Sequence, residues 1–122
     1  MALPESDDQI LLLHNPRCSK SRATLALLEE RGAKFEVREY LNEPLSRDEL
    51  SSVGERLGRP LRDWVRNKEA AFGEAGLSAD SADDAVLDAV VAHPILMERP
   101  IVIRGRRAAV GRPTEDVLAL LD

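Results

Sequence analysis

The hydrophobic pattern of the first 40 residues predicts a strand, a helix and a second strand. An apolar run over Gln9–His14 is followed by the turn pair Asn15-Pro16, as expected of a buried strand. Leucines then recur on one face from about Ser19 to Arg31, and Gly32 is a helix stop signal. A second strand is marked by the apolar positions Phe35, Val37 and Tyr40.

The middle of the chain is predicted to be helical. Ser46–Glu49 has the pattern of a capping box, in which a Ser and a Glu side chain bond each other's backbone N–H groups, so a helix should continue to about Leu57. Further elements are expected as a short helix over Leu61–Lys68, a turn around Ala70–Phe72, and a helix capped by Ser81–Asp84 that ends near His93-Pro94.

The last third of the chain predicts a β-hairpin and a closing helix. Pro100–Arg104 and Ala108–Val110 are short strand candidates joined by a turn at Gly105, and Pro113 suits the first position of a helix. The whole order favours the α/β class, with a small mixed sheet flanked by helices. This is the thioredoxin-like plan, with a helical insertion at about 46–93, and we expect residues 1–122 to form a single domain.

Composition excludes several classes of protein. The chain has 122 residues, of which 43% are hydrophobic and 32% charged, as in a globular domain. Its apolar runs are far shorter than the roughly 20 residues that cross a bilayer, and the first nine residues lack the features of a secretory signal. We therefore expect a cytoplasmic protein without a membrane partner. A net charge of -5 argues against nucleic-acid binding.

The charges are sorted along the chain. Between Lys68 and Arg99 the chain has seven acidic residues and no Lys or Arg. The segment Arg104–Arg112 has four arginines and no acidic residue. Such segregation is typical of a local anion site on an acidic protein. Charge alone favours the alternative, a solvated acidic helix beside an Arg-rich hairpin.

Cys18 is the only cysteine, which excludes an internal disulfide and a cysteine-based metal finger. It lies where the first helix begins, with Ser19 as a plausible cap, and a helix N-terminus stabilises a thiolate. The basic or titratable neighbours His14, Arg17, Lys20 and Arg22 would favour the thiolate further. A buried structural cysteine is the alternative, but this polar, basic segment argues against burial.

Cys18 and Ser21 have the spacing of a Cys-x-x-Cys motif whose second thiol is replaced by a hydroxyl. Serine cannot resolve a mixed disulfide, so the sequence favours single-thiol chemistry completed by an outside thiol. Ser21 has two interpretations: a hydrogen-bond donor to the thiolate, or an ordinary polar residue of the first helical turn.

Four arginines are candidates for binding an oxyanion, because a planar guanidinium offers paired N–H donors that match a tetrahedral anion. They are Arg22, Arg66, Arg99 and Arg112. Each taken singly is also typical of a surface or salt-bridging residue. Arg99 precedes Pro100, which occupies the position of a cis-proline that faces the cysteine in thioredoxin-like folds. We interpret His93 as structural, and Trp64 and Phe72 as packing of the insertion.

Several blocks of this sequence resemble the glutaredoxin-coupled arsenate reductase family. The resemblance covers about Gln9–Leu121 and rests on His14–Arg22, Arg66, His93–Val102 and Gly111–Pro113. It implies a thioredoxin-like fold and reduction of arsenate to arsenite by glutathione and glutaredoxin. By residue matching it implies Cys18 as the nucleophile, Arg66, Arg99 and Arg112 as oxyanion ligands, His14 as a residue that lowers the thiol pKa, and Ser21 and Arg22 as polar neighbours of the sulfur.

Three functions remain open at this point. The first is arsenate reductase, with arsenate or another small oxyanion, glutathione and glutaredoxin as partners and neither a bound cofactor nor a metal. The second is a glutathione-dependent thiol transferase, which needs Cys18 but not the three arginines together. The third is a redox-related regulatory binding protein, which Ser21 disfavours because such proteins commonly use two cysteines.

Overall fold

The computed structural model describes residues 2–59, 61–66, 69–78 and 80–121. The chain divides into two compact units, one made of residues 1–43 and 99–122 and the other of residues 44–98. The helical insertion expected at about 46–93 lies in the second unit, and a single domain stays a prediction. None of the helices in the described part of the chain has the length and apolar character that a membrane span requires.

The first unit contains a four-stranded mixed sheet. Its strands are β1 (Ile10–His14), β2 (Glu36–Glu39), β3 (Ile101–Arg104) and β4 (Arg107–Val110), in the spatial order β2-β1-β3-β4. β1 is parallel to β2, while β1 with β3 and β3 with β4 are antiparallel. The strand-helix-strand unit and the hairpin are therefore both confirmed, and together they make the thioredoxin-like sheet.

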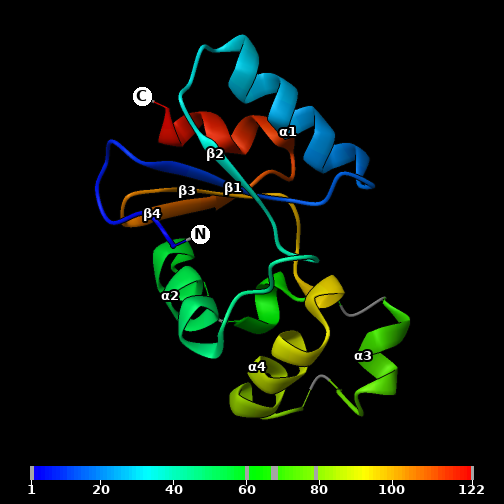
Figure 1. Cartoon of the computed structure of the whole chain (residues 1–122). Coiled ribbons are helices and arrows are strands. Elements are labelled where there is room, and N and C mark those ends of the chain that lie inside the picture. The colour runs from blue at the N-terminus through cyan, green and yellow to red at the C-terminus, as the bar shows by residue number, and fades with distance from the viewer. Residues whose placement is uncertain (1, 60, 67–68, 79, 122) are drawn as a thin grey trace. The chain divides into compact units, whose positions relative to one another are not determined.

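Two helices cover one face of this sheet (Figure 1). They are α1 (Ser19–Glu30) and the 3-10 helix η3 (Thr114–Leu120). The core between these helices and the sheet consists of Leu12, Leu28, Val102, Val117 and Leu120. Alternate residues of a strand point to opposite faces. The opposite face accordingly presents Leu11, Leu13, Ile101 and Ile103, and these are also buried. The apolar run of the first strand is explained by burial on both faces.

The end of α1 follows the sequence signal. Arg31 caps the helix, and Gly32 then adopts a positive φ of 69°, a conformation that side-chain-bearing residues rarely adopt. The N–H of Gly32 bonds the carbonyl oxygen of Glu29 at 3.0 Å. The chain thus turns sharply at Gly32 and returns to form β2.

The second unit is helical, as expected. Its elements are α2 (Arg47–Leu57), the 3-10 helix η1 (Leu61–Trp64), α3 (Ala70–Glu74), α4 (Asp83–Ala92) and the 3-10 helix η2 (Pro94–Leu96). Trp64 is completely buried and Phe72 half-buried, so Trp64 packs this unit more fully than Phe72 does. The apolar side chains Leu50, Val53, Val86 and Val90 are buried on α2 and α4.

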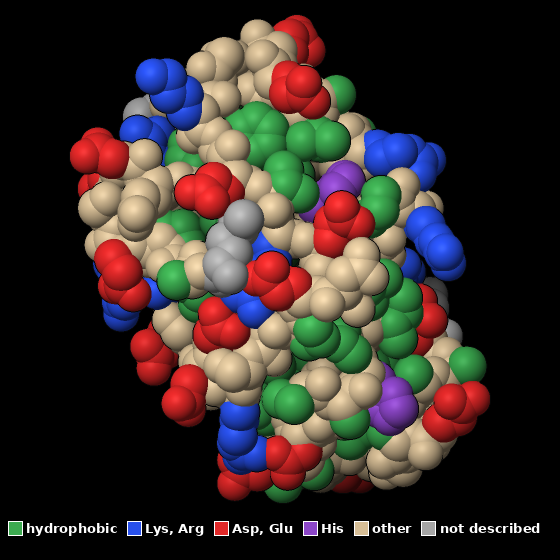
Figure 2. Space-filling view, viewed as in Figure 1, with side chains coloured by type: hydrophobic (Ala, Val, Ile, Leu, Met, Phe, Trp, Pro, Cys, Tyr) green, Lys and Arg blue, Asp and Glu red, His purple; other side chains and the backbone are tan. Residues whose placement is uncertain are grey.

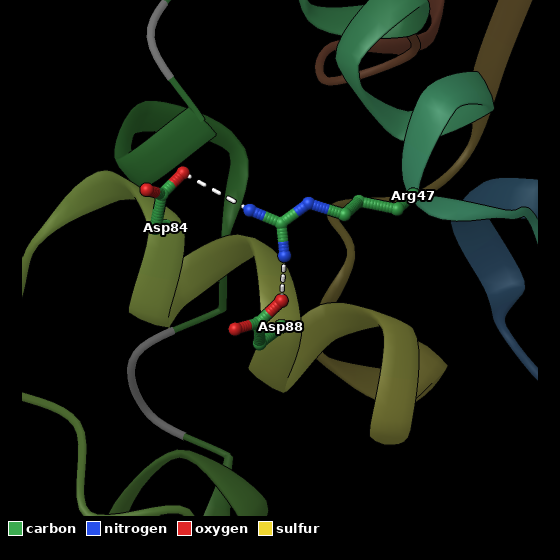
Figure 3. A network of polar contacts seen from close by, with 3 residues as sticks. All are labelled: Arg47, Asp84 and Asp88. Carbon is green, nitrogen blue, oxygen red and sulfur yellow. Dashed lines mark hydrogen bonds and ion pairs between the residues drawn. The ribbon is translucent and has the colours of Figure 1, made fainter.

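Polar contacts fix the start of α2. Ser46 accepts the backbone N–H of Glu49 at 3.1 Å, and Glu49 accepts that of Ser46 at 3.0 Å, which confirms the capping box. Arg47 then reaches from α2 to two carboxylates of α4, Asp84 at 3.0 Å and Asp88 (Figure 3). These side chains are largely exposed, so the bridge adds little to stability.

Three expected helix boundaries are wrong. Ala82, not Ser81, is the N-cap of α4, because the Ser81 hydroxyl accepts the N–H of Ser78 instead. Pro113 is the residue before η3 and not its first residue. The helix expected over Leu61–Lys68 is the single 3-10 turn η1, and residues 67–68 lie outside the described part of the chain. The turn expected at Ala70–Phe72 is a short α-helix.

Candidate active site

Cys18 occupies the N-cap position of α1. Its backbone is extended, with φ −95° and ψ 123°, and Ser19 is the first helical residue, so the expectation that Ser19 caps the helix is wrong. The thiol is free and partly exposed. The alternative of a buried structural cysteine is therefore excluded, and the sulfur stands at the positive end of a 12-residue helix.

The loop that carries Cys18 is held by Asn15, a residue that sequence reasoning treated only as a turn signal. Asn15 is buried, its side-chain oxygen accepts the N–H of Arg17 at 3.0 Å, and its carbonyl oxygen accepts the N–H of Cys18 at 3.0 Å. An Asn that bonds the backbone two residues later is a recognised turn device. The pattern Asn-x-Arg before the cysteine therefore contained this signal.

The pKa of the Cys18 thiol lies below its ordinary value. Partial burial raises the pKa, but the backbone N–H of Ser21, the Arg99 guanidinium and the backbone N–H of Lys20 lower it by more. Hydrogen bonds and a positive charge stabilise the thiolate relative to the thiol. This direction is the one expected from the sequence, and Arg99 is the cation among its causes.

His14 and Ser21 form a buried pair behind the thiol. The Nδ1 atom of His14 lies 2.6 Å from the Ser21 hydroxyl oxygen, which also accepts the backbone N–H of Asn15 at 3.0 Å. Burial lowers the pKa of His14 below its ordinary value; Glu39 opposes this effect and Arg22 adds to it. His14 therefore contacts Ser21, and Ser21 is the residue whose backbone faces the sulfur.

Two of the predicted arginines converge on Cys18 within the first unit. Nη2 of Arg112 lies 3.7 Å from the Cys18 sulfur, and Nε of Arg112 donates to the carbonyl oxygen of Arg99 at 2.6 Å. Arg99 is buried, and its guanidinium bonds the thiol. The Arg99-Pro100 peptide bond is cis, as the fold predicted. Arg22 instead donates from Nη1 to the carbonyl oxygen of Pro16 at 2.8 Å, so it braces the cysteine loop.

Gly111 is a further residue that sequence reasoning did not select. It precedes Arg112, its N–H bonds the carbonyl oxygen of Pro100 at 2.9 Å, and it is buried. A Cβ atom at this position would lie 2.7 Å from the Thr24 hydroxyl oxygen and 2.8 Å from Cγ of Pro100. Only glycine allows the two arginine-bearing segments to approach this closely.

Two other predicted residues belong to the second unit. Arg66 is half-buried there, and its Nη1 pairs with Glu69 at 2.7 Å, while its backbone N–H bonds the carbonyl oxygen of Leu96. The role of Arg66 in binding an oxyanion stays a prediction. His93 ends α4, and its side chain is exposed and not packed in a core.

Comparison with known proteins shows which family this chain belongs to. Residues 13–120 match the model of the ArsC family. The chain belongs to the ArsC family. Over 115 residues, 93% of this ArsC-family chain and 98% of its relative, it is 48% identical to a protein named arsenate reductase from Neisseria meningitidis. It is 43% identical to the uncharacterised protein YfgD of Escherichia coli, over 93% of this chain and 97% of that one.

A solved structure extends the comparison to the fold. The arsenate reductase from Vibrio cholerae superposes with a TM-score of 0.87 at 42% identity, over 92% of this chain and 97% of that one. The thioredoxin-like fold of this ArsC-family chain is therefore shown. Its site combines a stabilised thiolate with two guanidinium groups, which suits nucleophilic attack on a bound oxyanion.

Proposed function

We propose that this protein reduces arsenate to arsenite, with Cys18 as the nucleophile. The observation that carries the proposal is the convergence of Arg99 and Arg112 on the sulfur. These two guanidiniums and the start of α1 would bind a multiply charged tetrahedral anion next to the thiolate. The names of the relatives from Neisseria meningitidis and Vibrio cholerae support arsenate as that anion.

The arginines also suit the reaction itself. When the arsenic–oxygen bond breaks, negative charge develops on the departing oxygen, and preformed cationic donors stabilise it. Arg66 is proposed as a third ligand, by its match to the family pattern. Ser21 and His14 are proposed to hold the N-terminal turn of α1 so that its N–H groups face the sulfur.

The single cysteine supports a reaction that depends on outside thiols. The Cys18 thiolate attacks As(V) and displaces one oxygen as water, forming a sulfur–arsenic bond. The thiol of glutathione displaces a second oxygen, which takes up the thiol proton and also leaves as water. The sulfur of Cys18 and that of glutathione then form a disulfide as both sulfur–arsenic bonds break, and the two electrons released reduce As(V) to As(III). The reduced arsenic, left with two oxygens, takes up one water and leaves as arsenite. A glutaredoxin thiol would finally reduce this mixed disulfide, because the chain has no second cysteine of its own.

The decisive experiment is turnover of arsenate by the purified protein with glutathione and glutaredoxin. Cys18→Ser should abolish turnover. Arg66→Ala, Arg99→Ala and Arg112→Ala should each lower kcat/KM by about ten- to a hundredfold, as loss of a charged hydrogen bond of about 1.5–3 kcal/mol implies. Arg106→Ala is the matched control, since Arg106 is an exposed hairpin arginine near Glu5. Normal turnover in all three site variants would refute the oxyanion assignment.

The same assay tests the thiol transferase alternative. The protein is offered a mixed disulfide of glutathione with a small thiol in place of arsenate. Activity on this disulfide with none on arsenate, and with no effect of the arginine variants, would replace the proposal by the transferase function. The second relative, YfgD, gives no assignment that would favour either activity.

A further inference from the structure

The second unit contains a cleft between α2 and α4 that shares no described residue with the candidate active site. Its volume is about 530 Å³, which lies within the roughly 300–1,000 Å³ of small-molecule sites. Leu50 of α2, Leu87 of α4 and Trp64 of η1 line it. Leu50 and Trp64 are buried and Leu87 is half-buried, so the cleft offers apolar walls to a ligand.

One of these walls holds a buried hydrogen-bond donor without an acceptor. The Nε1–H group of Trp64 is buried, and no described residue accepts its hydrogen bond. A Cβ atom added at Gly54 would lie 3.7 Å from Cζ2 and 3.9 Å from Nε1 of Trp64. Gly54 also lines the cleft, so the N–H edge of the indole faces the cleft at this point. Buried N–H donors are nearly always bonded, and a ligand in the cleft would supply the acceptor.

Gly54 keeps the wall in front of this donor open. It lies in the interior of α2, where glycine is less favourable than alanine. Its φ is not positive, and an added Cβ atom would make only ordinary contacts, the nearest at 3.7 Å. Neither the backbone nor the packing therefore requires glycine here. A side chain at this position would instead occupy the cleft beside the indole N–H, and such breaks of a local rule are expected at functional sites.

The rim of the cleft is acidic. Three exposed carboxylates line it, Glu55 on α2 and Asp83 and Asp84 on α4. Glu55 has no ion-pair partner among the described residues. The one cation among the described residues that line the cleft is Arg59, whose Nη2 donates to the carbonyl oxygen of Asp63 at 2.6 Å. On the face seen in Figure 2, acidic side chains gather over α2 and α4. A cleft with an excess of one sign of charge attracts ligands of the opposite sign.

We propose that this cleft binds a small aromatic amine that carries a hydrogen-bond acceptor. The aromatic ring lies between Leu50 and Leu87, and the acceptor takes the indole N–H of Trp64. The ammonium group meets the carboxylates of Glu55 and Asp83 at the rim. Burial of the ring and bonding of the N–H give the affinity, and the charge selects a cation over a neutral molecule or an anion. The proposal does not depend on the proposed function, since the two sites share no described residue.

The test observes the indole N–H directly. Trp64 is the only tryptophan, so its indole gives a single signal in a proton–nitrogen correlation spectrum of the isotope-labelled protein. The probe is 4-(2-aminoethyl)benzamide, which has an amide carbonyl and an ammonium group at opposite ends of a ring. It should shift the indole proton downfield in a saturable manner. 4-Ethylbenzamide, which lacks the ammonium group, should bind about threefold or more weakly. 2-Phenylethylamine, which lacks the carbonyl acceptor, should bind without moving the indole proton downfield.

A substitution that fills the cleft tests the place of binding. Gly54→Leu puts a side chain that suits a helix into the cleft beside Trp64, so it should abolish the shift caused by the probe. Gly73→Leu is the matched control. Gly73 is also a helical glycine of the second unit, and no described atom lies within 4 Å of an added Cβ atom there. This control should bind the probe as the unchanged protein does.

A second pair of variants tests the role of the carboxylates. Glu55→Gln with Asp83→Asn should weaken binding of the aminoethyl probe about threefold or more and leave the binding of 4-ethylbenzamide unchanged. Glu74→Gln with Asp80→Asn makes the same change in net charge with the same residue types. Both side chains of this control are exposed, and neither is among the described residues that line the cleft. The control should leave the affinity for both molecules unchanged.

Several outcomes would overturn the proposal. One is the absence of a saturable shift up to about 10 mM probe, several times the Kd that the ligand efficiency of so small a molecule implies. Another is an unchanged shift in Gly54→Leu, which would place the probe elsewhere. Equal affinity for 4-ethylbenzamide, or equal weakening by the two pairs of charge variants, would show that the rim does not select a cation. If circular dichroism shows that Gly54→Leu does not fold, the three probe molecules and the charge variants decide the question.

Discussion

Gly111→Ala tests whether the backbone next to Arg112 is packed too closely against Thr24 and Pro100 to admit a side chain. The added Cβ would lie 2.7 Å from the Thr24 hydroxyl oxygen and 2.8 Å from Cγ of Pro100, well inside ordinary contact distance. Neither neighbour is the free end of a flexible chain, because Thr24 is buried on α1 and Pro100 is a ring. Overpacking of this kind typically costs about 1–3 kcal/mol, and the two simultaneous clashes place it near the upper end.

The assay is thermal unfolding followed by circular dichroism. At about 4 °C per kcal/mol for a chain of this size, Gly111→Ala should lower Tm by roughly 8–12 °C. Gly73→Ala is the matched control. Gly73 lies within α3 with no described atom near the position of an added Cβ, so this change should stabilise the protein by about 0.5–1 kcal/mol through helix propensity.

A second substitution tests the cause. Among the described residues the Thr24 hydroxyl has no hydrogen-bond partner, so Thr24→Ala removes one clash without breaking a bond. The double variant Thr24→Ala with Gly111→Ala should recover about 1 kcal/mol relative to the sum of the single changes, while the clash with Pro100 remains. An unchanged Tm in Gly111→Ala, or strict additivity of the two changes, would refute the reasoning.

Three shorter predictions concern the thiol, a helix cap and the buried histidine. When the alkylation rate of Cys18 is measured against pH, it should reach half its plateau at a pH below the free-cysteine pKa of about 8.5. Arg99→Gln should raise the pH of this midpoint because it removes a cation. An unchanged midpoint in Arg99→Gln would contradict the role of Arg99 in lowering the thiol pKa. Ser46→Ala should lower the free energy of unfolding by about 1 kcal/mol in urea titration, since it breaks the capping box of α2; Ser51→Ala, further along the helix, serves as its control. Burial lowers the pKa of His14 below the unfolded value of 6.5, so the unfolded chain binds more protons in acid. The contribution of neutral His14 to the free energy of unfolding is therefore full above pH 6.5 and declines as the pH falls below 6.5. When the free energy of unfolding is measured against pH, His14→Gln should flatten the curve below pH 6.5.

Much of the fold could be predicted because several elements begin, end or turn at short sequence patterns. The capping box at Ser46, the stop at Gly32 and the hairpin at Gly105 each depend on residues a few positions apart, and each is present in the structure. A predicted helix start was wrong where a side chain formed a different local hydrogen bond. The Ser81 hydroxyl accepts the N–H of Ser78 and does not cap α4. A side chain with two possible partners leaves that choice open in the sequence.

The site was predictable in its residue types but not in their contacts. The sequence selected Cys18, Arg99 and Arg112, and the structure brings them together. The sequence did not identify Asn15 or Gly111 as site residues. Asn15 holds the backbone of the cysteine loop by a hydrogen bond, and Gly111 allows neighbouring segments to approach closely. Such roles depend on neighbours that are distant in the sequence.

The sequence by itself determined that any redox cycle must use an outside thiol, because the chain has one cysteine and Ser21 cannot resolve a disulfide. It also determined a helix start beside that cysteine. Only the tertiary structure decided which cation lowers the pKa of the Cys18 thiol. Arg99 lies 81 positions from Cys18 in the sequence, yet its guanidinium bonds the sulfur, while the adjacent Arg17 and Lys20 point to solvent. The antiparallel pairing of β1 with β3 makes this contact, since it sets the end of one strand beside the start of the other.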